Sequence, residues 1–408
     1  MKRVVVIGVG AQGGTIAKKL DAEPAVEEII CADYDLKATK ELEKTLKKAK
    51  AVRVNAKDKR EIIDISKGTD LIVNGLPPDF NMNVMDAALE NRCNYQDLAC
   101  GPINENISFI DTVKRELNRD EEFKKTGITG LMNTGSAPGL ANIITRESLD
   151  KLDSCEKIEI LVYDGVWSKK FIPFWWSPET AFGDMAAQPV VFENGKFKMV
   201  NPFNNPKMED FRGLGKRRMV DHEHEEPVTM GLLSKHPALK GVKSVYFRYG
   251  GPALDLAEYF YKMGLLSEKP VDVNGAKVIP MELISKLTPP APKYPDEIQA
   301  VLDEGMISEE GAFVIRLFGE KNGKKVKYEN YVMAPGLTES FKKAKITHES
   351  YITGQSAFLF TKMLVNNKIK TKGVFPPELL EEKARAYFFK EAAKLDITVD
   401  EIVETKLY

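Results

Sequence analysis

The sequence has no apolar run near the roughly 20 residues that a membrane-spanning helix requires, so we expect no membrane segment. The apolar run after the N-terminus breaks at Gly8 and Gly10, which is too short for a secretory signal and typical of a buried strand. An excess of basic residues is also lacking, with 59 Lys and Arg against 60 Asp and Glu. Because nucleic acids and anionic membranes recruit proteins through such an excess, we expect neither as a partner.

Cysteine is scarce as well, with four residues in 408. They show neither CxxC spacing nor the density of a disulfide-stabilised domain, which predicts reduced thiols in a cytoplasmic protein. Histidine is equally rare, and two of the four, His222 and His224, stand among carboxylates at residues 221–226. An H-x-H pair of this kind is one pattern of a metal site, but no third ligand follows at a recognisable spacing. We therefore predict no metal.

The length predicts two or three domains. In the first 130 residues, short apolar runs rich in β-branched residues alternate with amphipathic stretches. The predicted strands are residues 4–7, 29–32, 52–54, 71–73, 95–98 and 128–132. Strands that alternate with helices predict βαβ units, and therefore an α/β fold with a doubly wound parallel sheet covered on both faces, as in a Rossmann domain.

After Gly135 the pattern changes. Residues 156–335 combine strand-like segments with loops rich in Pro, Asn and Gly, and two Asn-Gly pairs, at 194–195 and 322–323, predict tight β-hairpins. This region predicts a second α+β domain with a mainly antiparallel sheet. Helical patterns return at residues 353–365 and 377–395.

The sharpest motif is a glycine-rich turn between the first strand and the first helix, made of Gly8, Gly10, Ala11, Gln12 and Gly13. In such turns the first glycine allows a tight bend, the second lets a pyrophosphate approach the backbone, and the third lets the helix pack on the strand. The helix N-terminus then offers N–H groups to the phosphates. The motif predicts dinucleotide binding; the alternative is a purely structural turn.

Asp33 ends the second strand, twenty residues after Gly13. A carboxylate there hydrogen-bonds the ribose hydroxyls of NAD and repels the 2′-phosphate of NADP. We therefore expect NAD or NADP as the cofactor, with NAD only slightly favoured, because Lys37 is placed to neutralise a 2′-phosphate.

The fourth strand ends at Asn74 and continues into a turn that contains Leu76. Ligands of doubly wound sheets lie across the carboxyl ends of the strands, so both residues are candidates to line the nicotinamide side. Asp97, at the end of the next strand, is a candidate catalytic residue on the same rim. The alternatives are that Asn74 only shapes the turn and that Asp97 is a helix cap or a salt-bridge partner.

A family resemblance extends over nearly the whole chain, carried by the order and spacing of several motifs. They are residues 8–13 (GVGAQG), 94–97 (NYQD), 135–139 (GSAPG), 176–179 (WSPE), 192–196 (FENGK), 248–249 (RY), 263–266 (MGLL), 351–354 (YITG) and 373–378 (GVFPPE). The chain resembles saccharopine dehydrogenase-like oxidoreductases, the group of saccharopine reductases, lysine 6-dehydrogenases and carboxynorspermidine synthases. Many members have Asp-Pro-Gly where this chain has Ala137-Pro138-Gly139. That departure removes a carboxylate and puts saccharopine itself in doubt.

The resemblance implies a Rossmann domain of residues 1–135 with 350–408, and a substrate-binding and dimerisation domain of residues 136–349. It also implies a homodimer and substrate contacts at Pro138, Gly139 and Asn142. Trp176 is a candidate wall of the substrate pocket, although aromatic residues at this density more often belong to a core. Arg248 ends a strand-like run, where its guanidinium would hold a substrate carboxylate at two points; the alternative is an ion pair at the surface.

Together these features predict an NAD(P)-dependent oxidoreductase that transfers hydride at a C–N bond, either CH–NH or CH–NH2. The substrate would be a small, amino-acid-derived molecule such as saccharopine or lysine. Two alternatives stay open: a transferase of the homospermidine synthase kind with bound NAD, and a non-catalytic dinucleotide sensor. Net turnover of the cofactor separates the oxidoreductase from both.

Overall fold

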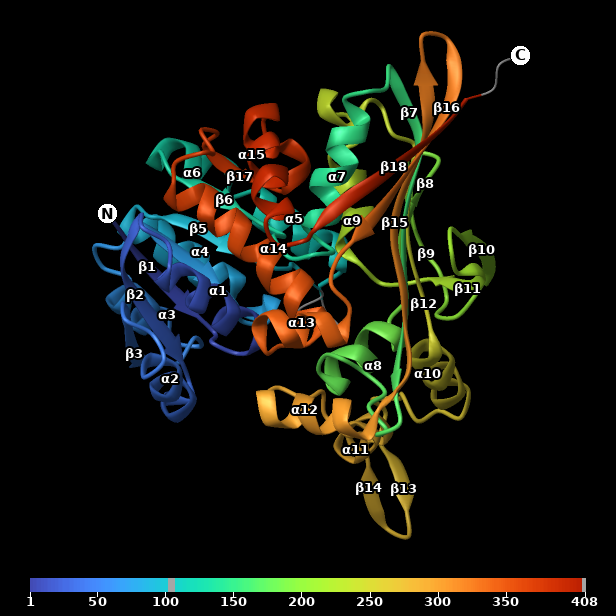
Figure 1. Ribbon diagram of the computed structural model, residues 1–408, viewed down its shortest axis with the longest axis horizontal. Coiled ribbons are helices and arrows are strands. Elements are labelled where there is room, and N and C mark those ends of the chain that lie inside the picture. The colour runs from blue at the N-terminus through green and yellow to red at the C-terminus, as the bar shows by residue number, and fades with distance from the viewer. Residues whose placement is uncertain (102–106, 406–408) are drawn as a thin grey trace. The chain divides into compact units, whose positions relative to one another are not determined.

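The computed structural model describes residues 1–101 and 107–405, and the chain divides into two compact units (Figure 1). The first unit comprises Met1–Lys151 and Ile352–Thr398, and the second comprises Leu152–Tyr351 and Val399–Tyr408. Across the described ranges 1–101 and 107–405, no helix combines the length and the apolar character needed to cross a membrane.

The first unit contains a seven-stranded sheet whose described pairings are all parallel. Its order is β17 (Gly373–Phe375), β6 (Thr129–Leu131), β5 (Asn94–Asp97), β4 (Leu71–Asn74), β1 (Lys2–Ile7), β2 (Val26–Asp33) and β3 (Ala49–Arg53). The central strands are apolar and largely buried, as in a sheet covered on both faces. The predicted parallel, doubly wound sheet is confirmed.

Helices connect these strands in the order that the alternating pattern predicts. They are α1 (Ala11–Asp21), α2 (Leu36–Glu43), α3 (Lys59–Ile65), α4 (Asn81–Asn91), α5 (Phe109–Leu117), α6 (Asp120–Thr126), α7 (Leu140–Leu149), α14 (His348–Val365) and α15 (Glu382–Ala393), with 3₁₀ turns at Pro78–Phe80 and Pro377–Leu379. Local chemistry sets several starts: the side chains of Asp35, Asp58 and Ser108 accept hydrogen bonds from N–H groups of the first turns of α2, α3 and α5.

The unit boundaries differ from the predicted domain boundaries by two residues at 350–351, and by longer segments in two other places. Residues 136–151 lie in the first unit, because α7 is almost wholly buried there and its Asn142 donates to Glu378, at 2.9 Å, in the C-terminal part of the same unit. The last strand, β18 (Thr398–Thr405), joins the sheet of the second unit beside β16. An ion pair of 2.7 Å between Arg212 and Asp400 helps to hold it there.

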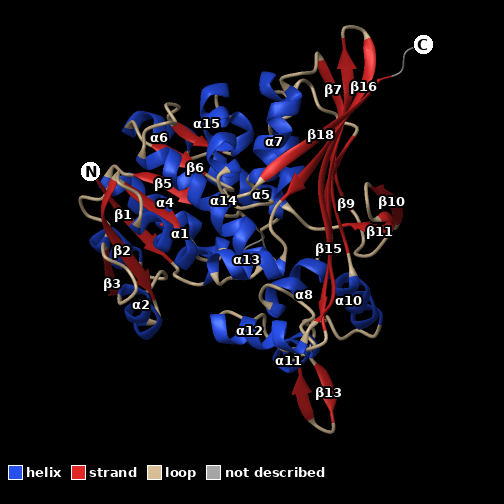
Figure 2. Cartoon of the chain, viewed as in Figure 1, coloured by secondary structure: helices blue, strands red, loops and turns tan. Residues whose placement is uncertain are grey.

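The second unit is built on a nine-stranded mixed sheet, seen as long red arrows in Figure 2. Its main path is β10 (Lys207–Phe211), β11 (Gly215–Asp221), β12 (Ser244–Gly250), β7 (Ser154–Ser168), β15 (Met306–Lys321), β16 (Lys324–Met333) and β18, and β8 (Val190–Glu193) with β9 (Lys196–Met199) branches from β12. Strands β7 and β12 run parallel, whereas the other pairings with a described register are antiparallel. The predicted, mainly antiparallel second sheet is confirmed.

Both predicted hairpins are present, joining β8 to β9 and β15 to β16. Asn194 and Gly195, and likewise Asn322 and Gly323, have positive φ, as the tight turns of two-residue hairpins require.

The other elements of this unit are helices and one small hairpin. They are α8 (Pro178–Ala186), α9 (Glu225–Leu232), α10 (Pro252–Lys262), α11 (Pro280–Leu287), α12 (Pro295–Glu304), α13 (Leu337–Ala344), a 3₁₀ turn at Pro237–Leu239, and the hairpin of β13 (Val271–Val273) and β14 (Ala276–Val278). Trp175, Ile298 and Phe341 belong to one buried cluster, and Leu161 and Met219 belong to another.

Candidate functional site

The carboxyl ends of the parallel strands bring several predicted site residues to one edge of the first unit. Ile7 lies opposite Ala32 on one side and Asn74 on the other, and Asn74 lies opposite Asp97. The glycine turn, Asp33, Asn74 and Asp97 therefore follow or end neighbouring strands at this edge, where doubly wound sheets bind their ligands.

Glycine occupies the three positions of the turn for different reasons. Gly8 has a φ of +82°, and a Cβ added to it would lie 2.8 Å from the carbonyl carbon of Gly75. A Cβ on Gly13 would lie 1.9 Å from the carbonyl oxygen of Gly8, so the fold itself excludes side chains at both positions. A Cβ on Gly10 meets no atom within 4 Å. The protein backbone does not require glycine at position 10, whereas a ligand that approaches the main chain would.

Helix α1 begins at Ala11, directly after this turn, and no side chain caps it. The N–H groups of its first turn therefore keep their capacity to bind an anion, and the helix dipole favours negative charge there. The buried Oε1 atom of Gln12, in the same turn, has no hydrogen-bond partner among the described residues. The open space at Gly10, the uncapped helix and this amide fit the diphosphate of a nicotinamide dinucleotide.

Asp33 is tied to the turn by its carboxylate, which accepts hydrogen bonds from the N–H groups of Val9 at 2.9 Å and Asp35 at 3.0 Å. Arg53, at the end of β3, lies opposite Asp33, and its guanidinium covers the ring of Tyr34 at 4.6 Å. Sequence reasoning missed Arg53, because only the pairing of β2 with β3 brings it beside the acid. A cation at this place is suited to a ribose 2′-phosphate.

Asn74 is fully buried, and the protein uses both ends of its amide. Its Nδ2 donates to Oδ1 of Asn81 at 2.8 Å, and its Oδ1 accepts from the N–H of Leu76 at 3.3 Å. These contacts are those of a turn-shaping residue. Leu76 is half-buried, and its side chain lies close to Gly8, so it stays a candidate for cofactor contact beside the glycine turn.

Asp97 is 1% exposed, and its Oδ1 accepts a hydrogen bond of 2.6 Å from the N–H of Asn133. Its Oδ2 is buried and accepts no close hydrogen bond from the described residues, although the nearby hydroxyl of Tyr95 favours the ionised carboxylate and lowers its pKa. Burial raises the pKa of this carboxyl to about 7, so the group can hold or release a proton near neutral pH. This is the property expected of a proton-transferring residue.

Asn133, beside Asp97, is a candidate that sequence reasoning missed. It is buried with a φ of +61°, an unusual conformation for a residue other than glycine. Both polar atoms of its amide find no hydrogen-bond partner in the described parts of the chain. Buried amides are rarely left this way, which makes the edge next to Asp97 suited to a polar ligand.

The predicted substrate residues after Gly135 form a tight turn into α7. Gly139 has a φ of +129°, and a Cβ on it would lie 2.2 Å from the carbonyl oxygen of Gly135. Pro138 is buried, and Asn142 accepts from the N–H of Gly139 at 2.8 Å. Because Asn142 also donates to Glu378, its amide fixes this turn and the start of the helix. Contact of these residues with a substrate stays a prediction.

In the second unit, Trp176 is half-buried and meets the ring of Tyr249 edge-on, with centroids 6.0 Å apart. The guanidinium of Arg248 is in a different environment from the one predicted. The side chain is 1% exposed, with Nε 2.9 Å from Asp221 and Nη1 3.0 Å from Glu159. These carboxylates already neutralise it, so the anchoring of substrate predicted for Arg248 is not part of the function proposed below.

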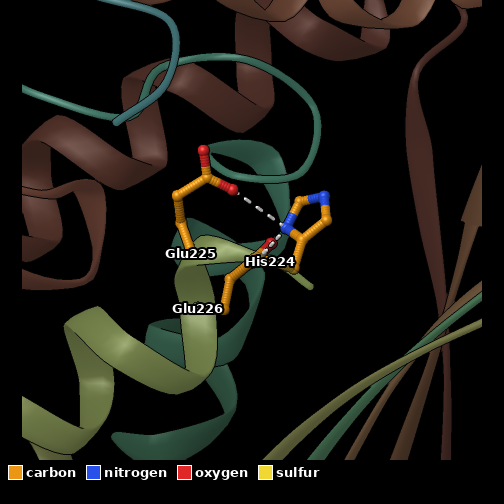
Figure 3. Close-up of side chains that lie close together, drawn as sticks. All are labelled: His224, Glu225 and Glu226. Carbon is orange, nitrogen blue, oxygen red and sulfur yellow. Dashed lines mark hydrogen bonds and ion pairs between the residues drawn. The ribbon is translucent and has the colours of Figure 1, made fainter. Parts of the chain in front are cut away.

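The two histidines of the H-x-H pattern lie between β11 and α9. Nδ1 of His224 is hydrogen-bonded to Oε2 of Glu226 and lies 3.3 Å from Oε2 of Glu225 (Figure 3). Candidate ligand atoms of these three residues lie within 4.8 Å of one another. The sequence spacing offered no third ligand, whereas the first turn of α9 brings two carboxylates to one imidazole.

Comparison with known proteins agrees with this architecture. Residues 4–131 match the family model described as the saccharopine dehydrogenase NADP binding domain, and residues 135–394 match the saccharopine dehydrogenase C-terminal domain. A carboxynorspermidine synthase of Vibrio alginolyticus is 25% identical over 350 residues, which cover 83% of this chain and 80% of the relative. A carboxyaminopropylagmatine dehydrogenase of Synechocystis is 22% identical over 391 residues, which cover 93% of each protein.

Two solved structures share the fold. The L-Glu-forming saccharopine dehydrogenase of Saccharomyces cerevisiae has a TM-score of 0.69 at 15% identity, covering 99% of this chain and 100% of that structure. The homospermidine synthase of Legionella pneumophila, solved in complex with NAD, has a TM-score of 0.67 at 14% identity. The match covers 100% of this chain and 94% of that structure.

These matches confirm the predicted family, the predicted fold and a nicotinamide cofactor, NAD or NADP. They also place the chain among oxidoreductases, without specifying its substrate. The protein belongs to the saccharopine dehydrogenase family.

Proposed function

We propose that this protein is an NAD(P)-dependent oxidoreductase that forms or oxidises the C–N bond of a secondary amine carrying both a carboxylate and further amino groups. The observation that carries the proposal is Asp97, a buried carboxyl with a pKa near 7 on the same sheet edge as the glycine turn. Hydride transfer at a C–N bond changes the protonation of the nitrogen or of its partner, so it needs such a group beside the cofactor.

The names of the relatives support the class of substrate. Carboxynorspermidine combines a carboxyl group with a polyamine, and carboxyaminopropylagmatine combines one with an aminopropyl derivative of agmatine, which carries a guanidine. Such a molecule arises when a primary amine condenses with an aldehyde that carries a carboxylate, with loss of water, and the resulting imine is reduced. The proposed substrate is therefore amino-acid-derived, as the sequence predicts, but longer and more cationic than lysine.

Different residues of the first unit would bind the cofactor and transfer the proton. The turn at Gly8–Gly13 and the start of α1 would hold the dinucleotide diphosphate, and the bound nicotinamide supplies or accepts the hydride. In the reductive direction, the imine nitrogen would gain the electron pair of the C=N π bond and would then need a proton. Asp97 would hold, at its Oδ2, the proton exchanged with that nitrogen.

A steady-state assay tests the proposal. The protein is mixed with NADPH or NADH, a diamine or agmatine, and a short amino acid with an aldehyde side chain, and the nicotinamide absorbance is followed. We expect stoichiometric oxidation of the reduced cofactor only when amine and aldehyde are both present. Cofactor binding without net oxidation by any pair of substrates would refute the proposal and favour a recycling transferase or a sensor.

A further inference from the structure

Three consecutive residues of the second unit, His224, Glu225 and Glu226, direct their side chains to one point (Figure 3). We call them the histidine–glutamate cluster. Nδ1 of His224 is hydrogen-bonded to Oε2 of Glu226 and lies 3.3 Å from Oε2 of Glu225. One candidate ligand atom from each residue lies within 4.8 Å of the other two. The cluster therefore presents one nitrogen and two carboxylate groups to a single ligand.

The backbone explains how three consecutive side chains can meet. His224 lies just before α9 in an extended conformation, with a φ of −164° and a ψ of 160°, and Glu225 and Glu226 are the first two residues of the helix. Neighbouring side chains point to opposite faces of a strand and to different faces of a helix. The change from extended to helical backbone after His224 interrupts both patterns, so that the two carboxylates converge on the imidazole (Figure 3).

Packing holds these side chains in place. The imidazole of His224 stacks on the ring of Phe247, in β12, with centroids 3.7 Å apart and planes 12° from parallel. Residues 225–231 of α9 are all buried, so the glutamates start from a fixed backbone. The side chain of His224 is still 18% exposed, which gives an ion a path to the cluster. Donors that are held in this way bind an ion without a large loss of conformational freedom.

An unpartnered atom of Glu226 points to a ligand independently of the clustering. The residue is fully buried, and its carboxylate is directed at the imidazole (Figure 3). Oε2 is used in the hydrogen bond with His224, whereas Oε1 has no hydrogen-bond partner within the described chain. Buried carboxylate oxygens are rarely left unpaired, because they lose their hydration without compensation. A cation bound to this carboxylate would supply the missing interaction.

The charges of the cluster favour a divalent cation. In the described ranges 1–101 and 107–405, the ion pairs of Glu225 and Glu226 lead only to His224, and no lysine or arginine joins them. An imidazolium carries one positive charge, which balances only one of two carboxylates. A divalent ion bound to the neutral imidazole would balance both.

The donor types and their spacing suit Zn²⁺. This ion binds imidazole nitrogen and carboxylate oxygen at about 2.0–2.2 Å, usually in tetrahedral geometry, which places two ligand atoms roughly 3.4 Å apart. The 3.3 Å between Nδ1 of His224 and Oε2 of Glu225 matches that spacing. The ion would replace the proton between His224 and Glu226, so these two groups would separate slightly. Mg²⁺ and Ca²⁺ prefer six or more oxygen ligands and fit this set less well.

We infer that His224, Glu225 and Glu226 form a Zn²⁺ site, in which Nδ1 and one oxygen of each glutamate are the protein ligands and a water completes the tetrahedron. The sequence analysis predicted no metal, because no third ligand follows His222 and His224 at a recognisable spacing. In the structure the further ligands are the two glutamates that open α9, and His222 is not one of them. The ion would fix the start of α9, and the site goes beyond the proposed function, because hydride transfer from a nicotinamide requires no metal.

Isothermal titration calorimetry tests this inference on the full-length protein after treatment with a chelator and dialysis, without cofactor or substrate. We expect one Zn²⁺ per chain and no comparable binding of Mg²⁺. Glu225→Gln and Glu226→Gln should each weaken Zn²⁺ binding at least about 100-fold, because changes to residues that only support metal ligands already cost about 10–100-fold. His236→Gln, which removes an exposed histidine of the same unit, is the matched control and should bind as the unchanged protein does.

Thermal unfolding gives a second readout. Zn²⁺ should raise the melting temperature of the unchanged protein and of His236→Gln, but not that of Glu225→Gln. No Zn²⁺ binding, equal binding by all variants, or loss of binding in His236→Gln alone would overturn the site. Glu225→Gln keeps the hydrogen bond between His224 and Glu226, so it decides the question if Glu226→Gln fails to fold. Because Zn²⁺ binding and nicotinamide oxidation are measured separately, failure of this inference is distinguishable from failure of the proposed function.

Discussion

Replacing Gly10 by alanine should separate cofactor binding from folding. The added Cβ would meet no protein atom within 4 Å, and Gly10 has a φ of −64°, which alanine adopts readily. We therefore expect the free energy of unfolding to change by less than about 1 kcal/mol, with any gain coming from the restriction that alanine places on the unfolded chain. A methyl group at this position would hold the diphosphate away from the N–H groups of α1. Loss of one or two such charge-assisted hydrogen bonds costs about 1.5–3 kcal/mol each, so the dissociation constant for the dinucleotide should rise at least tenfold.

Gly13→Ala is the contrasting variant. Its Cβ would lie 1.9 Å from the carbonyl oxygen of Gly8, so the strand and helix must move apart and the melting temperature should fall, whether or not cofactor is present. The assay is thermal unfolding of each variant without cofactor, together with fluorescence titration by NADPH and NADH. Unchanged dinucleotide affinity in Gly10→Ala would refute the assignment of this turn as the phosphate-binding site. A large loss of stability in that variant would show that the space at Gly10 is required by the fold.

Three further sets of variants test individual side chains. Burial raises the pKa of Asp97 to about 7, against about 3.9 in an unfolded chain. Between these two values the folded state keeps a proton that the unfolded state has lost. The free energy of unfolding therefore falls as the pH rises from about 4 to 7. The substitution Asp97→Asn should therefore raise the free energy of unfolding by roughly 3 kcal/mol more at pH 8 than at pH 5, and the variant should lose turnover. An equal change in melting temperature at both pH values would contradict this. Arg248→Met leaves Asp221 and Glu159 buried without their cation, so we expect a loss of about 3–5 kcal/mol in urea unfolding, against less than about 1 kcal/mol for the exposed Arg212→Ala. Normal stability with a raised KM for the carboxylated substrate alone would restore the anchoring role of Arg248. Asp33→Ala should shift the ratio of kcat/KM for NADPH to that for NADH about tenfold toward NADPH, and Arg53→Ala should shift it about tenfold toward NADH. An unchanged ratio in both variants would show that neither side chain reaches the ribose.

The parts of the fold that follow from local rules could be predicted from the sequence. Buried β-branched runs predicted the parallel strands, and the Asn-Gly pairs predicted both hairpins, because each depends on a few adjacent residues. The glycine turn belongs to the same class, since Gly8 and Gly13 are required by close contacts around one strand–turn–helix unit. The place of β18 could not be predicted, because its partner β16 lies some 70 residues away in the chain and its sequence does not specify which sheet it joins.

Arg53 and Asn133 were missed for a related reason. Arg53 lies beside Asp33 only because β3 pairs with β2, and Asn133 lies beside Asp97 only because of how β5 and β6 end. Neither position carries a motif, and each gains its significance from a neighbour on another strand. The one local signal was at Asn133, an asparagine at the end of a strand, where a positive φ is tolerated more readily than by most residues.

Arg248 shows why charged residues are the hardest to interpret from a sequence. An arginine at the end of a strand is compatible with either a binding site or an internal ion pair. The structure distinguishes them by the balance of opposite charges: Arg248 has two carboxylates within hydrogen-bond distance and a third at 3.9 Å. A buried charge that the protein already neutralises has little left for a ligand, and removing one partner of such a pair destabilises the fold. The ion pairs of Arg248 with Asp221 and Glu159 therefore favour a structural role over the substrate anchoring that the sequence predicts.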